Sequence, residues 1–283
     1  MLNLTLMEKI DYLVIGHLTC DLTRSGSRMG GTAAYSALTA SVLGLRVGIV
    51  TSWAGDLPLG PLSQVQIYNF PTDTSTTFEN IYTSYGRIQY LHHVAPRLDY
   101  HLIPELWRSA PIIHLGPVAQ EVEPAIARRV AGSLVCLTPQ GWLRTWDKEK
   151  RVHSTEWPEA AFVLSQAGAA VLSVEDVDNS DERIEELATY CRILAVTEAD
   201  QGSRLYWNGD VRRFRPPDVT EVDATGAGDI YAAAFFSRLY TTRDPWEAAR
   251  FATQLAAYSV TRTGLEASVP TPTEVEECLV EVL

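Results

Sequence analysis

The chain has 283 residues, of which 46% are hydrophobic, so it can bury a large core, and we expect one α/β domain over residues 1–283. Its formal charge of −12 argues against a nucleic-acid partner, because proteins that bind a phosphate backbone usually present a basic face. Residues 1–9 lack a basic segment followed by an apolar one, and no stretch has the length of a membrane span. We therefore expect a cytoplasmic protein without a membrane partner.

The four cysteines show no Cys-x-x-Cys spacing, and each lies in an apolar or helical context. They are interpreted as reduced core residues, namely Cys20, Cys136, Cys191 and Cys278.

The first predicted strand is a continuous apolar run at residues 11–16, which is typical of a strand buried in a parallel sheet. Asp21 follows this run, and open α/β sheets bind their ligands at the carboxyl ends of strands. Asp21 is thus a candidate for binding substrate hydroxyls. Capping of the following turn is an equally good interpretation of this residue taken alone.

A pair of glycines, Gly30 and Gly31, precedes a small-residue stretch at 32–43 that predicts a helix ended by Gly44. Paired glycines let the backbone approach a bound ring closely. The helix is followed by a predicted strand at 45–53.

The segment 72–94 is rich in β-forming residues, and its two runs, 74–82 and 87–91, predict a hairpin that turns at Tyr85 and Gly86. This hairpin is expected on the acceptor side of the site. His92 and His93 are not expected to bind a metal, because adjacent strand residues point to opposite faces.

From residue 110 short apolar strands alternate with helical stretches, which predicts a parallel sheet covered by helices. The predicted strands are 112–115, 134–137, 170–173, 193–197 and 203–207, and the predicted helices are 124–131, 156–166, 181–191 and 245–263.

Residues 226–229 read Gly-Ala-Gly-Asp and lead into an apolar, Ala-rich helix. A glycine turn that opens a helix presents unpaired N–H groups to an anion, and the helix dipole adds to the attraction. Gly226, Ala227 and Gly228 are therefore predicted to bind a phosphoryl group. Asp229 is placed to take a proton from a hydroxyl that attacks this phosphoryl group. The alternative is a tight turn in which Asp229 only interacts favourably with the helix dipole.

The string Asp-x-Thr-Gly-Ala-Gly-Asp at 223–229 resembles the C-terminal signature of the ribokinase-like (PfkB) carbohydrate kinases. The order of Asp21, the paired glycines, the small-residue helix and Gly55-Asp56 resembles the N-terminal half of the same family. The resemblance implies a three-layer αβα sandwich with a mostly parallel central sheet, and a kinase that uses ATP and Mg²⁺. By it, Asp21, Gly30 and Gly31 would bind the acceptor.

Several positions depart from the family pattern. Only eight residues separate Asp21 from Gly30, where long-lid members insert two strands, so the lid is expected to be reduced or absent. Tyr35 stands where many relatives carry Asn, and Thr138 and Gln140 replace an Asp-x-Asn pair. Tyr35 and Gln140 are nonetheless assigned to the acceptor, because both can form hydrogen bonds.

The next two positions concern charged groups. Arg144 is suited either to a phosphate or to an ion pair with Asp147, and of these the ion pair is favoured. Asp176 occupies the acidic position of the family's Asn-x-x-Glu, which helps to organise magnesium, with Glu175 as the alternative.

The donor side is assigned by resemblance alone. Thr197 and Gly202 match the Thr-x-Gly-x-x-Gly nucleotide loop, in which Ala199 replaces the first glycine. The remaining implied positions are Thr225 and Gly264 for the nucleotide, and Asp223 and Ser268 for a monovalent cation such as K⁺.

The pattern is closest to the short-lid branch that includes myo-inositol kinase, so an inositol-like polyol is the first acceptor expected, with a sugar or a nucleoside behind it. The partners are then a small acceptor and a nucleotide, in a monomer or a homodimer not formed through a long lid. The competing interpretation is a non-catalytic ligand-binding protein, which Tyr35 and Thr138 favour and which the retained Asp21 and Asp229 disfavour.

Overall fold

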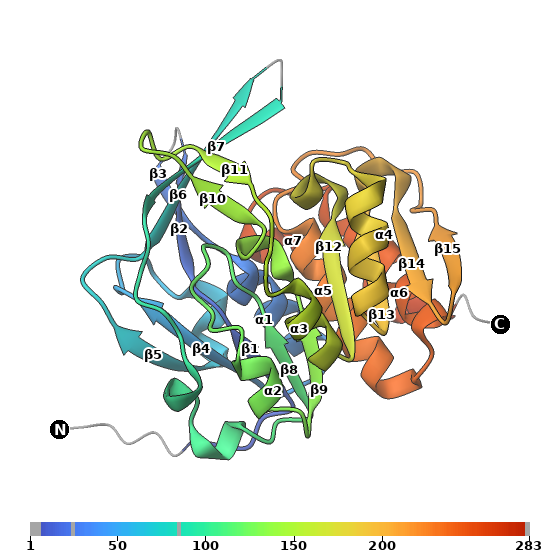
Figure 1. The fold of residues 1–283 in the computed structure, drawn as a ribbon, viewed down its shortest axis with the longest axis horizontal. Helices are drawn as coiled ribbons and strands as arrows, with labels where there is room; N and C mark the ends of the chain where they lie inside the picture. Colours follow the sequence, from blue (N-terminus) through green and yellow to red (C-terminus); the bar gives the residue numbers. More distant parts are fainter. Residues whose placement is uncertain (1–6, 24–25, 84–85, 281–283) are drawn as a thin grey trace.

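The computed structural model describes residues 7–23, 26–83 and 86–280, so residues 1–6 of the N-terminal segment used above lie outside it. Its described residues form a central sheet with the strand order β15-β14-β13-β12-β9-β8-β1-β4-β5 (Figure 1). These strands are β1 (Tyr12–Ile15), β4 (Val47–Trp53), β5 (Gln66–Pro71), β8 (Ile112–Leu115), β9 (Leu134–Leu137), β12 (Ala169–Ser173), β13 (Ile193–Thr197), β14 (Ser203–Trp207) and β15 (Asp210–Phe214). All neighbouring pairs are parallel except those that β14 forms with β13 and β15.

Helices cover both faces of this sheet (Figure 1). One layer contains α1 (Thr32–Val42), α5 (Ala227–Thr242), α6 (Pro245–Ser259) and α8 (Pro272–Val280), and the other contains α2 (Ile126–Arg129), α3 (Ala160–Gln166) and α4 (Asp181–Tyr190). Strand β1 is apolar throughout because Tyr12 and Val14 pack into the first layer, whereas Leu13 and Ile15 pack into the second. The predicted three-layer αβα sandwich is confirmed.

Short helical segments complete the described chain. They are α7 (Leu265–Ser268) and the 3₁₀ turns η1 (Gly60–Gln64), η2 (Tyr100–Leu102), η3 (Glu105–Trp107), η4 (Pro139–Gly141), η5 (Val174–Val177) and η6 (Ala199–Gln201). Among the described residues no helix is long and apolar enough to cross a membrane.

A second sheet stands over the carboxyl edge of the first, in the order β3-β2-β6-β7 (Figure 1). Its strands are β2 (Thr19–Thr23), β3 (Gly26–Gly30), β6 (Thr76–Thr83) and β7 (Gly86–His93). We call this sheet the lid. It is not absent: the few residues between Asp21 and Gly30 make a tight β2–β3 hairpin, and the segment 72–94 supplies the other pair. The predicted turn residue Tyr85 lies outside the described residues.

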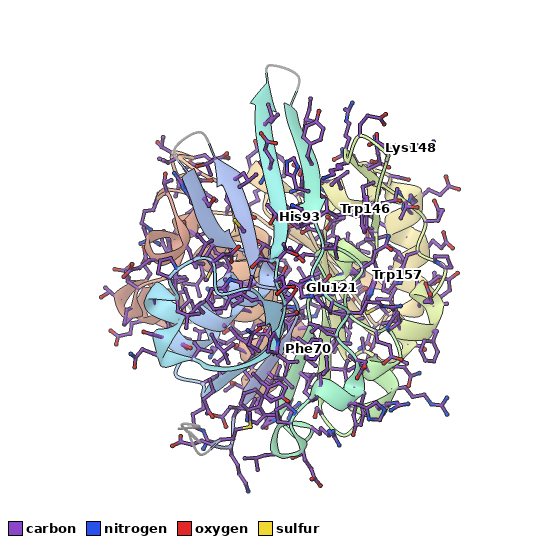
Figure 2. All side chains as sticks on the ribbon, turned by 90° about the vertical axis from the view of Figure 1, so that its left-hand side faces the viewer. Phe70, His93, Glu121, Trp146, Lys148 and Trp157 are labelled. Carbon is purple, nitrogen blue, oxygen red and sulfur yellow. The ribbon has the colours of Figure 1, made fainter. Side chains whose placement is uncertain are left out.

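A further hairpin, β10 (Arg144–Trp146) and β11 (Val152–Ser154), lies beside the lid strand β7. The Leu91 amide donates to the Lys150 carbonyl at 2.9 Å, which joins the hairpin to the lid. Figure 2 labels Trp146 and Lys148 of this hairpin on one side of the lid strands, with Lys148 at the tip of the hairpin. The hairpin was not predicted, because its strands are too short to display a hydrophobic alternation.

A buried carboxylate, Glu121, holds the loop after β8 against the end of β1 (Figure 2). Its side chain is 0% exposed and accepts hydrogen bonds from the backbone amides of His17, Val118 and Ala119, at 2.7–3.1 Å. Without the Glu121 carboxylate these three backbone amides would be buried without hydrogen-bond partners, which would lower the stability of the fold.

Replacing this carboxylate by an amide should destabilise the fold. In Glu121→Gln one acceptor oxygen becomes an NH₂ group facing amide donors, so we expect the free energy of unfolding to fall by about 2 kcal/mol. Urea unfolding measures this change. Glu123→Gln is the matched control, because Glu123 lies two positions away and its side chain forms no hydrogen bond among the described residues. Equal stability of the two variants would contradict the assignment.

Candidate active site

The glycine turn before α5 has the geometry of an anion-binding site. Gly226 is the N-cap of α5 and adopts a left-handed conformation, with φ of 82°. The Asp223 Oδ1 accepts a hydrogen bond from the Thr225 amide at 3.0 Å, which orders the approach to the turn. The Ala227 amide donates to the Ala224 carbonyl, whereas the Gly226 and Gly228 amides donate to no acceptor among the described residues. Two of the three predicted amides are therefore available to a ligand.

Tyr35 of α1 packs directly on this turn. A Cβ atom added to Gly226 would lie 2.3 Å from Cε1 of the Tyr35 ring, so the ring rests on the glycine. The side chain is 4% exposed, and its hydroxyl has no hydrogen-bond partner among the described residues. Burial raises the pKa of Tyr35 and the carboxylates of Asp21, Asp229 and Asp223 raise it further, so the phenol stays protonated.

Asp229 lies in the first turn of α5, directly after the glycine turn. Burial raises the pKa of Asp229 to about 6. A hydrogen bond from the buried Thr32 side chain and the positive charge of Arg144 oppose this shift, while Asp176 and Asp21 add to it. A carboxylate with a pKa just below neutral is ionised at pH 7 and still basic enough to accept a proton in catalysis.

The acceptor-side residues meet at the base of the lid. Asp21 Oδ1 accepts a hydrogen bond from Thr19 at 2.9 Å, and a Cβ on Gly30 would lie 2.2 Å from Asp21 Oδ2. Gly31, with φ of 88°, is the N-cap of α1, and a Cβ there would lie 2.7 Å from the His17 carbonyl oxygen. Neither glycine position has room for a side chain, because neighbouring protein atoms fill the space, and the close approach to a bound ring stays a prediction.

The loops after β9 and β12 meet through Gln140 and Asp176. The Gln140 amide donates to Asp176 Oδ1 at 3.1 Å, and the Ser173 amide donates to Asp176 Oδ2 at 2.9 Å. Ser173 and Asp176 thus form a capping box at the start of η5, and Glu175 beside them is exposed. The described residues contain no cluster of three or more metal ligands. This arrangement fits Mg²⁺, which keeps several waters and takes one or two carboxylates together with substrate phosphates.

The residues assigned to the nucleotide lie at the ends of strands and helices. Ala199 adopts a left-handed conformation, with φ of 49°, which favours glycine, and Gly202 packs against the Phe214 carbonyl. The Thr197 hydroxyl donates to the Leu172 carbonyl at 3.5 Å. Gly264, with φ of 91°, is the N-cap of α7.

The two residues assigned to a monovalent cation share the C-terminal end of α6. The Asp223 amide donates to the Val260 carbonyl at 3.0 Å, and the buried Ser268 hydroxyl donates to the Arg262 carbonyl at 3.4 Å. No contact between Asp223 and Ser268 themselves accompanies these bonds, so their joint role remains a proposal.

Thr32 was missed by the sequence interpretation, although it bonds the side chain of Asp229. Its position directly after Gly31, as the first residue of α1, is the signal that could have found it. The Thr138 hydroxyl lies 2.9 Å from His114 Nε2, and His114 Nδ1 lies 3.1 Å from the Tyr12 hydroxyl, so Thr138 is held by a buried polar chain below the site.

Comparison with known proteins tests the resemblance. A family model described as pfkB family carbohydrate kinase matches residues 154–272, which include the glycine turn. The predicted resemblance to the PfkB carbohydrate kinases is confirmed. The predicted kinase class of the chain is thereby confirmed, because the relatives it matches are named kinases. The cytidine kinase of Thermococcus kodakarensis is 25% identical over 252 residues, which are 81% of this chain and 88% of that protein.

Another curated relative is the inositol 3-kinase of Oryza sativa subsp. japonica, 32% identical over 154 residues, which are 52% of this chain and 38% of that protein. Among solved structures, a pyrophosphate-dependent kinase in the ribokinase family, complexed with a pyrophosphate analog and myo-inositol, superimposes with a TM-score of 0.78. It is 18% identical, and the alignment covers 94% of this chain and 99% of that chain. At this identity the likeness supports the ribokinase-like fold and nothing finer.

Proposed function

We propose that this kinase transfers the terminal phosphoryl group of ATP to a hydroxyl of a small cyclic polyol such as inositol. The observation that carries the proposal is the placement of Asp229, whose pKa is about 6, directly after the glycine turn at Gly226 and against Thr32, the residue that follows Gly31. A base, an anion-binding turn and a hydroxyl-binding carboxylate are the groups that phosphoryl transfer to an alcohol requires.

In the proposed reaction Asp21 binds acceptor hydroxyls and the reacting hydroxyl gives its proton to Asp229. The acceptor oxygen forms a bond to phosphorus, the bond from phosphorus to the bridging oxygen of ATP breaks, and ADP leaves with that electron pair. The amides of Gly226 and Gly228 donate hydrogen bonds to the phosphoryl oxygens. Asp176, with Glu175 beside it, would hold Mg²⁺ through water, and the ion would neutralise charge on the ATP phosphates.

The nucleotide would lie against the loops that carry Thr197, Gly202, Thr225 and Gly264. A monovalent cation near Asp223 and Ser268 is part of the same proposal. A nucleoside is the second acceptor class, because the cytidine kinase of Thermococcus kodakarensis matches most of this chain.

The test is ADP release from MgATP with a panel of inositols, aldoses, ketoses and nucleosides, with the Asp229→Asn protein as the blank. Acceptor-dependent release by the wild type alone would support the kinase and identify its acceptor class. Thermal shifts with the same compounds but no release would favour the non-catalytic ligand-binding protein, because a ligand that binds only the folded state raises its melting temperature.

The pH dependence of turnover should report the base. Protonated Asp229 cannot accept the hydroxyl proton, so we expect kcat/KM to be constant near pH 7.5 and to fall about tenfold per pH unit below about pH 6. Initial rates between pH 4.5 and 8.5, with stability checked at each pH, measure this limb. If kcat/KM fell only near pH 4, burial would not raise the pKa of Asp229.

A further inference from the structure

The β10–β11 hairpin bridges the two sheets that enclose the site. Its base follows directly from η4, where the Leu143 amide donates to the Pro139 carbonyl at 3.2 Å. Its far end is fixed to lid strand β7, where Lys150 Nζ donates to the His92 carbonyl at 3.1 Å and the Leu91 amide donates to the Lys150 carbonyl. The hairpin therefore lies between η4, at the carboxyl edge of the main sheet, and lid strand β7 (Figure 1).

Arg144, the first residue of β10, belongs to the inner face of this hairpin. Exposure alternates along β10, because Thr145 is exposed while Arg144 and Trp146 are half-buried. Trp146 packs against the buried cluster of Phe78, Leu91, Val118 and Ala119 under the lid. Residues two apart on a strand share a face, so the Arg144 side chain extends toward the same enclosed space. Gln120 Nε2 donates to the Arg144 carbonyl at 2.5 Å and fixes the backbone there.

The surroundings of Asp229 are acidic, and Arg144 is the cation that acts on them. Asp176 and Asp21 raise the pKa of Asp229 by their negative charge, whereas Arg144 lowers it. A donor with several phosphate charges is repelled by such a set of carboxylates unless positive charge lies nearby. The alternative partner of Arg144 was Asp147, whose carboxylate instead accepts from His153 Nε2 at 2.9 Å and from the Arg151 amide at 2.8 Å.

We propose that Arg144 is a catalytic residue that binds the phosphoryl group as it passes from donor to acceptor. The inference rests on the proposed kinase function. The guanidinium donates hydrogen bonds to the non-bridging phosphoryl oxygens, opposite the amides of the glycine turn, while the proton of the acceptor hydroxyl goes to Asp229 and the donor leaves with the electron pair of its bridging oxygen. Because the hairpin that carries Arg144 is tied to β7 at Lys150, lid position and phosphoryl binding are coupled through one hairpin.

The test compares Arg144→Gln with wild type in donor binding and in turnover. Calorimetric titrations use MgATP in one arm and inorganic pyrophosphate in the other, so that a nucleotide and a bare phosphate chain are distinguished. For whichever of the two donors binds the wild-type protein, we expect the affinity of Arg144→Gln to be about tenfold lower. With the best acceptor of the panel, we expect kcat of the variant to be about 10²-fold lower. Arg151→Gln is the matched control, because Arg151 is an exposed arginine on the other side of the same hairpin.

The pH profile separates a catalytic role from a structural one. Loss of the cation raises the pKa of Asp229, so the acid limb of kcat/KM should move above pH 6 in Arg144→Gln and return toward pH 6 in Arg144→Lys. Unchanged donor affinity and kcat would overturn the inference, as would a loss of activity that follows the melting temperature without any movement of the limb. If wild type binds neither donor and phosphorylates no acceptor, the proposed function itself fails and this inference falls with it.

Discussion

Asp229→Asn is expected to lower kcat about 10³-fold while leaving acceptor and donor binding within a few-fold of wild type. The amide keeps the shape of the carboxylate and can still accept the Thr32 hydrogen bond, but it cannot take a proton from the attacking hydroxyl. Single-turnover rates and calorimetric titrations measure the two quantities separately. A variant that kept wild-type turnover would show that another group is the base.

The same substitution should stabilise the protein at neutral pH. Because burial raises the pKa of Asp229, the folded state binds its proton more tightly than the unfolded state, and the ionised form is disfavoured in the fold. Wild type therefore gains stability from this group as the pH falls through 6, and loses it as the pH rises. We expect a melting temperature a few degrees above wild type at pH 7.5 for Asp229→Asn, a smaller difference at pH 4.5, and none once the pH lies below the ordinary Asp pKa of 3.8.

Asp218→Asn is the control for the change of charge. Asp218 is exposed in the loop that leads to the glycine turn, and its side chain has no partner among the described residues. Wild-type kcat and melting temperature are expected for this variant. Stabilisation by Asp218→Asn as well would assign the effect to the net charge of −12 and not to the burial of Asp229.

The strands and helices that could be predicted are those whose signal lies within their own segment of the sequence. Strands β8, β9 and β13 were predicted with the bounds they have, because each is a short apolar run between polar turns. Helix α6 was predicted from its Asp244 cap, which accepts hydrogen bonds from the amides of Trp246 and Glu247. Its end was placed four residues too late, since it stops at Ser259.

The β2–β3 half of the lid was harder to predict, because its short strands carry charged residues and few apolar ones. Asp21 and Arg28 pair across β2 and β3 on one face, so this segment carries no apolar alternation longer than a few residues. The sequence also showed which glycines open a helix, but not what packs on them. The contact of Tyr35 with Gly226 depends on how α1 lies against α5, which no local pattern contains.

Gly226→Ala is expected to remove turnover and stability together, because the position is constrained twice. A residue with a Cβ at φ of 82° costs about 1–2 kcal/mol, and the added methyl would lie within 2.6 Å of three Tyr35 ring atoms. The ring and the start of α5 must separate, which turns the Gly228 amide away from the phosphoryl group. We expect a fall in kcat of at least about 10²-fold and a melting temperature several degrees below wild type.

Gly228→Ala tests whether glycine is needed in this turn for the fold itself or for the space that a bound phosphoryl group occupies. A Cβ at Gly228 would meet no protein atom within 4 Å and its φ is not left-handed, so the protein should be as stable as wild type or more stable by up to about 1 kcal/mol. Its methyl would still stand in the open space above the helix end, where the phosphoryl group is proposed to bind. Loss of turnover in a fully stable Gly228→Ala protein would therefore support ligand binding at the turn, and retention of turnover would place the phosphoryl group elsewhere.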